Sequence, residues 1–207
     1  EATGSVVINL ALTGQQAINA EVGRDTLTAI ENVIGGMGAD NLSGTTGANV
    51  IDGGAYIGTV SSINTTPDDV LDGLAGIDTV SYASALRAVK VSLLTQGAGV
   101  FQNTWGGGYD SLIGFENVTG SAFNDTLTGD GTVNVITGGA GNDTMDGGAG
   151  NDLIVGGDGA GDDLYRGGAG VDTVKYTSAK AGINVNLSQS TGTAGSTNTK
   201  INFSGSS

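Results

Sequence analysis

The amino-acid sequence predicts an all-β fold, a β-helix solenoid of short parallel strands, and three observations support the prediction. Gly occurs 39 times in 207 residues against a single Pro, and Asp occurs 17 times against 4 Glu. A nine-residue unit also recurs at fixed spacing through two parts of the chain. Because Gly and Asp favour tight turns and are poor helix formers, each unit is expected to be a turn followed by a short strand.

The nine-residue unit has Gly at positions one, two and four, Asp at position six and an apolar residue at position eight. Its clearest copies are GGAGNDTMD at residues 138–146 and GGAGNDLIV at residues 147–155. In the second half of the chain, units begin at Gly120, Gly129, Gly138, Gly147, Gly156 and Gly167. An earlier run has units at Gly35, Gly44, Gly53 and Gly73, interrupted by an insertion at about residues 56–67.

A longer repeat surrounds these runs. DTLTAIENVIG at residues 25–35 matches DSLIGFENVTG at 110–120, and GIDTVSYASA at 76–85 matches GVDTVKYTSA at 170–179. Apolar residues alternate after each block boundary, which predicts three equivalent, longer flanking strands: Val6, Ile8 and Leu10; Val89, Val91 and Leu93; Ile183, Val185 and Leu187. The predicted organisation is a first block at 1–88, a second at 89–182 and the start of a truncated third at 183–207. The sequence is expected to be a fragment of a longer repetitive protein.

Two units are expected to complete one coil of the solenoid, so that position eight points inward at every unit. The predicted core is therefore a stack of these side chains: Leu42, Ile51, Leu71, Val80, Leu127, Ile136, Met145, Ile154, Tyr165 and Val174. Such a core is thin, and Gly-rich turns lose much backbone entropy on folding. The turns must therefore be stabilised by something other than apolar burial.

The charge and the missing residue types indicate which kind of stabilisation is available. The net charge of −14 argues against binding to nucleic acid or to anionic membranes, and no apolar run is long enough to span a membrane. Cys and His are absent, so only oxygen ligands remain for a metal. Ca²⁺ takes 6 to 8 oxygens in flexible geometry, which stacked Gly-Asp turns can supply, whereas Mg²⁺ fits less well.

Units two apart should stack directly, which brings their position-six side chains together. On one edge these are Asp125, Asp143 and Asp163, and on the other Asn134, Asp152 and Asp172; the first run gives Asp40 with Asp69 and Asn49 with Asp78. Backbone carbonyls near the turn glycines are expected to complete the calcium sites, namely those near Gly36, Gly38, Gly139, Gly141, Gly148, Gly150, Gly157, Gly168 and Gly170.

The unit GGxGxDxUx resembles the repeat of the RTX, or haemolysin-type calcium-binding, proteins. The resemblance is strongest over residues 120–174 and clear over 35–80. It implies a parallel β-roll that is unfolded in the calcium-poor cytoplasm, leaves the cell by type I secretion and folds on external calcium. It therefore implies an extracellular or cell-surface location.

Several positions depart from the repeat. Asn49 and Asn134 replace Asp, Thr45 and Ser121 replace Gly, and two extra residues precede Asp163. The calcium sites at these positions are expected to be weaker or absent. Asp25 and Asp110 lack the full Gly set and are interpreted as structural turn residues.

We expect this chain to be a calcium-rigidified structural module of a secreted cell-surface protein, of the surface-layer or adhesin type, and not an enzyme. The alternative is the C-terminal secretion and folding module of a type I-secreted protease, lipase or alginate epimerase. Expected partners besides calcium are further copies of the chain in a lattice or filament, and a surface polysaccharide. Trp105 is expected to cover an open end of the coil, and a stacking platform for a glycan is the alternative role. Ice binding by a row including Asn142 and Asn151 is disfavoured, because Ala140 and Ala149 stand where Thr is needed.

Overall fold

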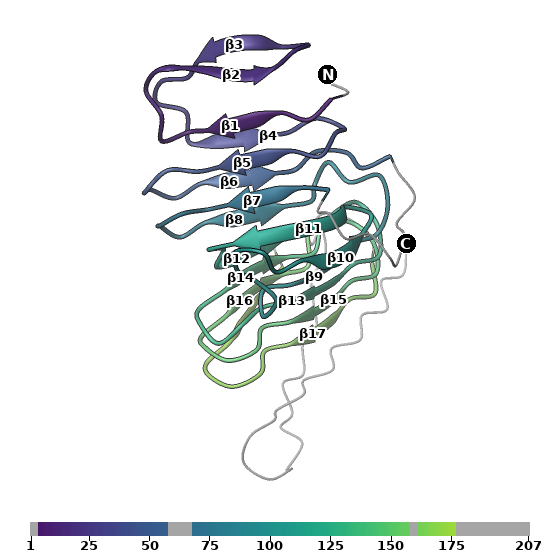
Figure 1. The fold of residues 1–207 in the computed structure, drawn as a ribbon. Helices are drawn as coiled ribbons and strands as arrows, with labels where there is room; N and C mark the ends of the chain where they lie inside the picture. The colour runs from purple at the N-terminus through teal and green to yellow at the C-terminus, as the bar shows by residue number, and fades with distance from the viewer. Residues whose placement is uncertain (1–3, 58–67, 158–160, 177–207) are drawn as a thin grey trace, which may run out of the picture.

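The chain winds as a roll in which short strands alternate between two faces and successive coils stack along one axis (Figure 1). The computed structural model describes residues 4–57, 68–157 and 161–176. Every regular element in these ranges is a β-strand. The all-β parallel roll predicted from the sequence is confirmed. The third block expected at 183–207 and most of the insertion at 56–67 lie outside the described residues.

One face is a continuous sheet of seven parallel strands in the order β18-β16-β14-β12-β8-β6-β4. Its strands are β4 (Asn32–Ile34), β6 (Val50–Asp52), β8 (Thr79–Ser81), β12 (Asn117–Thr119), β14 (Val135–Thr137), β16 (Leu153–Val155) and β18 (Thr173–Lys175). Neighbours in this sheet come from alternate units, so two units complete one coil.

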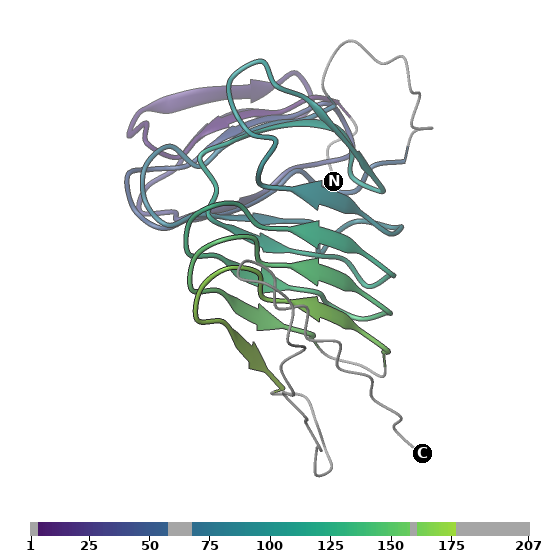
Figure 2. The same cartoon turned by 90° about the horizontal axis from the view of Figure 1, so that it is seen from below.

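The other face consists of two sheets with the orders β1-β5-β7-β11-β10 and β17-β15-β13-β9. The first contains β1 (Val7–Asn9), β5 (Asn41–Ser43), β7 (Val70–Asp72), β10 (Gln102–Trp105) and β11 (Gly108–Ile113). The second contains β9 (Lys90–Ser92), β13 (Thr126–Thr128), β15 (Thr144–Asp146) and β17 (Leu164–Arg166). Figure 2 shows the two faces of the second block joined by turns at both edges.

Two antiparallel hairpins interrupt the repeating pattern. β2 (Gln15–Asn19) pairs with β3 (Gly23–Thr26), and β10 pairs with β11. Strands β1 and β9, expected to be long, have three residues like the strands of the repeats, and the longest strands lie in the hairpins. Asp25 and Asp110 were expected in turns, and this is wrong: both lie in hairpin strands.

The core is the stack of position-eight side chains. Leu42, Ile51, Leu71, Val80, Leu127, Ile136, Met145 and Ile154 have no exposed surface, and Tyr165 is 3% exposed. Val174, at the last strand, is partly buried against the stack. Each strand of the nine-residue units contributes one such side chain, as the period predicts, and buried residues of the block boundaries, among them Val89, Leu93 and Phe115, extend the core.

Candidate calcium sites

At one edge of the roll, position-six carboxylates of the first block form a ladder along the axis. The N–H of Val6 donates to Oδ1 of Asp40 over 2.8 Å, and the N–H of Asp40 donates to Oδ1 of Asp69 over 2.8 Å. The N–H of Asp69 in turn donates to Oδ1 of Asp110 over 3.3 Å. Each carboxylate therefore binds the backbone of the coil before it.

The same ladder repeats in the second block. The N–H groups of Val89, Asp125 and Asp143 donate to Oδ1 of Asp125, Asp143 and Asp163 over 2.7, 2.8 and 3.0 Å, respectively. These residues stand directly before β13, β15 and β17. The strict repeat of the bond shows that the stacking of turns, and not a chance contact, places the carboxylates.

The opposite edge has an equivalent ladder before the strands of the seven-stranded face. Asn49 N–H donates to Asp78 over 2.7 Å, Asn134 N–H donates to Asp152 over 2.9 Å, and Asp152 N–H donates to Asp172 over 3.1 Å. The structure therefore brings together every pair of position-six residues that the spacing predicts.

Three position-six carboxylates have a buried oxygen that receives no hydrogen bond: Oδ2 of Asp78, Asp143 and Asp152. By contrast, Oδ2 of Asp40 accepts the N–H of Gly36 over 2.7 Å, and Oδ2 of Asp125 accepts that of Ser121 over 2.6 Å. A buried carboxylate oxygen without a donor is costly unless a cation compensates it. These orphaned oxygens therefore fit a bound cation.

Backbone carbonyls approach the same oxygens. A Cβ added at Gly138 would collide with Oδ2 of Asp143 and lie 2.7 Å from the carbonyl oxygen of Gly156. A Cβ at Gly147 would collide with Oδ2 of Asp152 and lie 2.5 Å from the carbonyl oxygen of Gly167. Only a residue without a side chain leaves this space between the oxygens open.

The donor set suits calcium rather than a softer metal. Among the described residues no three acidic side chains converge on one point, so carbonyls must supply most of the ligands at any site. The carbonyls of Gly36, Gly139, Gly141, Gly148 and Gly150 face the turn one coil further on, where a Cβ would meet them. The carbonyl of Gly148 also accepts the N–H of Ala169 over 2.9 Å, which leaves its second lone pair available. Four further glycines were expected beside calcium-ligating carbonyls. Gly38 lies in the first run of units, and the last described turns contain the other three, Gly157, Gly168 and Gly170.

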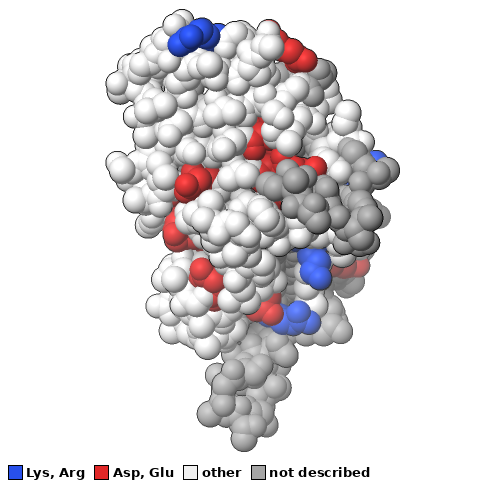
Figure 3. Space-filling model, in the orientation of Figure 1, with Lys and Arg blue, Asp and Glu red and all other residues white. Residues whose placement is uncertain are grey.

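The electrostatics of the ladder disfavour negative charge in the absence of a metal. Burial, together with the neighbouring carboxylates Asp125 and Asp163, raises the pKa of Asp143 to about 7, although the hydrogen bond from the N–H of Asp125 lowers it. Burial likewise raises the pKa of the carboxyl groups of Asp40, Asp78, Asp125 and Asp152. Acidic side chains gather along the middle of the roll (Figure 3).

Asn49 and Asn134 have a structural role that the sequence did not reveal. The Nδ2 of Asn49 donates to the carbonyl of Glu31 over 2.6 Å, and that of Asn134 donates to the carbonyl of Glu116 over 2.7 Å. The Oδ1 atom of each accepts a backbone N–H from its own turn. Glu31 and Glu116 are equivalent residues of the two blocks, so both substitutions of Asp by Asn meet the same need for a donor.

The ladders also contain two acids that were not among the predicted site residues. Asp110 continues the first edge, and its Oδ2 accepts the hydroxyl groups of Tyr82 and Thr104 over 3.0 and 2.7 Å. Glu116 continues the other edge by accepting the N–H of Asp78 on Oε2 over 2.8 Å. The alignment of residues 25–35 with 110–120 shows that both acids recur in the two blocks. Only the stacking of the blocks reveals that Asp110 and Glu116 contact the ladders.

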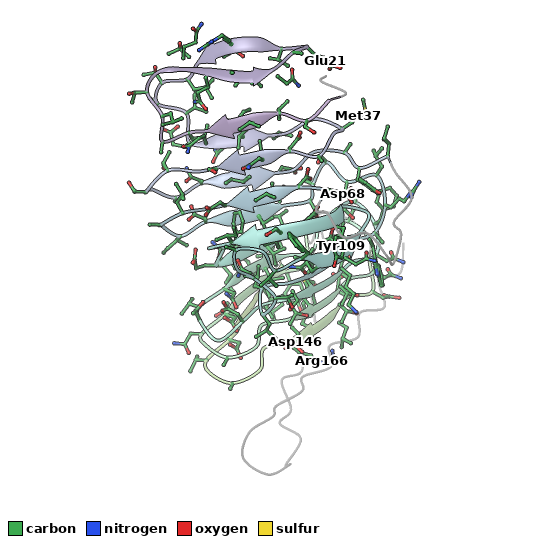
Figure 4. All side chains as sticks on the ribbon, in the orientation of Figure 1. Glu21, Met37, Asp68, Tyr109, Asp146 and Arg166 are labelled. Atoms are coloured by element: carbon green, nitrogen blue, oxygen red, sulfur yellow. The ribbon has the colours of Figure 1, made fainter. Side chains whose placement is uncertain are left out.

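Other polar side chains singled out in the sequence accept hydrogen bonds from backbone N–H groups. Oδ2 of Asp68 accepts the N–H of Tyr109 over 2.7 Å, and Figure 4 shows both residues at the hairpin. The amide oxygens of Asn142 and Asn151 accept N–H groups of the next coil over 2.9 and 2.8 Å. Trp105 is 47% exposed, with the amine of Lys90 5.8 Å from its ring centroid.

The comparisons with known proteins agree with this geometry. Residues 34–55, 110–144, 128–161 and 146–174 match the model of the RTX calcium-binding nonapeptide repeat in four copies. A search of curated proteins finds no match to the chain. In the described part of the chain, no helix is long and apolar enough to cross a membrane. The roll therefore contains four copies of the RTX calcium-binding nonapeptide repeat, within residues 34–55 and 110–174.

Proposed function

We propose that this chain is a calcium-binding structural module of a secreted, cell-surface RTX protein, of the surface-layer or adhesin type, which folds and becomes rigid on binding extracellular Ca²⁺. The observation that carries the proposal is the set of buried oxygens without donors on Asp78, Asp143 and Asp152. They stand at turns that stack along both edges of the roll, so bound cations would tie each coil to the next.

The proposed ligands are the position-six carboxylates and the turn carbonyls beside them. Within the second block, Asp125, Asp143 and Asp163 serve one edge and Asp152 and Asp172 the other, and in the first block the ligands are Asp40, Asp69 and Asp78. Asn49 and Asn134 are proposed as weak positions, because both amide groups are already hydrogen-bonded within the protein.

The same features supply a reason for folding outside the cell. Without metal, several buried carboxyl groups must either bind protons or carry unfavourable charge. The core is thin and offers limited compensation. Calcium that binds the folded chain but not the unfolded chain would stabilise the roll by mass action.

A calcium titration of metal-free protein, followed by far-ultraviolet circular dichroism, tests the proposal. We expect a cooperative gain of β signal at roughly 10⁻⁴ to 10⁻³ M calcium, the range of extracellular modules. Magnesium at the same concentration is the control and should not produce the transition. A complete β spectrum without metal, unchanged by calcium, would contradict calcium-dependent folding.

The alternative is that the roll is the secretion and folding module of a type I-secreted enzyme. Hydrogen bonds that run unbroken from β7 to β11 and from β8 to β12 favour the structural module, because they join the two blocks into one rod. A surface polysaccharide is a further proposed partner, because Trp105 is 47% exposed and an exposed indole ring can stack on a sugar.

A further inference from the structure

The two blocks meet at a junction that buries apolar surface. Residues 111–113 of β11 pair in parallel with β7, with Leu112 opposite Leu71, and β12 pairs with β8, with Val118 opposite Val80. Leu112 and Val118 have no exposed surface, and Phe115 between the two strands is 1% exposed. The last coil of the first block therefore completes the core of the second.

The same segment occurs at the start of the first block, where no described strand pairs with the outer edge of β4. Ile30, the equivalent of Phe115, is 43% exposed, and Ile34 is 70% exposed. Strand β3 ends at Thr26, two residues short of the equivalent of Ile113, where β11 ends. Among the described residues β4 is the outermost strand of its sheet. We define the N-terminal face by its members: Thr26, Leu27, Thr28, Ile30, Val33 and Ile34.

Polar groups of the junction are repeated at the N-terminal face as well. Asp110 and Glu116 accept the N–H groups of Asp69 and Asp78, and their equivalents are Asp25 and Glu31, both exposed. Acceptors for a neighbouring coil are thus present, together with the apolar side chains. Figure 3 shows few charged side chains over the upper end of the roll, which β1 to β4 form.

We propose that the N-terminal face binds the coil β17–β18 of a second copy of this chain, so that copies assemble head to tail. This coil is equivalent to β7–β8, since GVDTVKYTSA at 170–179 matches GIDTVSYASA at 76–85. Within the described residues, β17 and β18 are the outermost strands of their sheets. The proposal rests on the calcium-folded roll proposed above.

The register of the internal junction fixes the contacts between copies. Leu27 would lie opposite Tyr165 and Val33 opposite Val174, as Leu112 and Val118 lie opposite Leu71 and Val80. On the outer surface, Thr28 would lie beside Arg166, which Figure 4 shows at the lower end of the roll.

The coil β17–β18 differs from its equivalent in the first block in the charge of its outer surface. Arg166 and Lys175 are at the positions that Asp72 and Ser81 occupy in the first block. The coil β17–β18 therefore has a basic side chain at the end of each strand, while Asp163 and Asp172 stand directly before the strands. In the register of the junction, Asp25 and Glu31 would accept the N–H groups of Asp163 and Asp172, as Asp110 and Glu116 accept those of Asp69 and Asp78.

Site-directed cross-linking tests the register, because the chain has no native Cys. Copies with Thr28→Cys are mixed with copies with Arg166→Cys in saturating calcium and treated with a short bismaleimide. A covalent dimer is expected from this pair and not from Thr28→Cys mixed with Val133→Cys, which is exposed in a turn away from both ends. Equal cross-linking of the two mixtures would overturn the register.

Sedimentation of the calcium-loaded chain tests the assembly itself. We expect oligomers that grow with protein concentration, lost in Ile30→Asp and retained in the matched control Val133→Asp. Circular dichroism of each sample separates the two proposals. A folded chain that stays monomeric at its highest soluble concentration overturns head-to-tail docking alone, whereas a chain that calcium does not fold overturns the proposed function and, with it, the docking.

Discussion

The backbone N–H of Asp125 donates a 2.8 Å hydrogen bond to Oδ1 of Asp143, which stands at the same position of the turn one coil further along. The other oxygen of Asp143 is buried and receives no hydrogen bond. The two oxygens of one carboxylate therefore have different roles: Oδ1 holds adjacent coils together, and Oδ2 faces the carbonyls of the turn. This division explains why the repeat requires Asp and not simply a turn-forming residue.

Asp143→Asn should have opposite effects with and without calcium. It removes an anionic ligand, so the calcium midpoint should rise several-fold, but it also removes a buried charge whose pKa is raised to about 7. The metal-free fold at pH 8 should therefore gain at least about 1 kcal/mol. Urea unfolding with and without calcium measures both effects. Asp146→Asn, the same change in strand β15, is the control and should leave both quantities nearly unchanged.

The metal-free roll should be more stable in acid than at neutral pH. Burial raises the pKa of Asp143 above its ordinary value of 3.8 and likewise that of Asp40, Asp78 and Asp152. The folded state thus binds protons more tightly than the unfolded state, so stability is full below about pH 4 and is lost as pH rises through about 7. Circular dichroism in a chelator across this range measures it. A metal-free spectrum independent of pH would show that the ladder carboxyl groups are not buried as described.

Gly148→Ala should destabilise the calcium-loaded roll by about 2 kcal/mol or more. Gly148 has φ of +96°, and an added Cβ would collide with the carbonyl oxygen of Asp130 one coil away. Gly131→Ala is the matched control, because nothing lies within 4 Å of its Cβ position, and it should change stability by less than about 0.5 kcal/mol. Thermal unfolding in excess calcium compares the two, and equal losses would count against stacked turns.

Asn134→Asp restores the repeat consensus, yet it should destabilise the roll by about 1 to 3 kcal/mol. The substitution replaces the Nδ2 donor to the carbonyl of Glu116 by a carboxylate oxygen, which would face that carbonyl with no hydrogen between them. Denaturant unfolding measures the loss, and Asn49→Asp should repeat it through Glu31. If Asn134→Asp instead stabilised the calcium-loaded chain, position 134 would be a calcium ligand that the native sequence has weakened.

The sequence by itself determined the coil. A nine-residue period with Gly at fixed positions specifies a turn and a short strand, and it places side chains such as Leu127 and Met145 in the core. The same period pairs Asp143 with Asp163 and Asp152 with Asp172, because residues at one position of stacked units must meet. These features follow from local geometry repeated along the chain, so spacing is sufficient to predict them.

Only the tertiary structure decided what happens where the repetition is interrupted. The pairing of β11 with β7 and the hydrogen bond from Asp69 to Asp110 both depend on how one block stacks on another. No local period encodes that stacking, because it is set by register between segments about 40 residues apart. The physical reason is that a solenoid repeats its contacts from coil to coil, whereas each junction makes its contacts once.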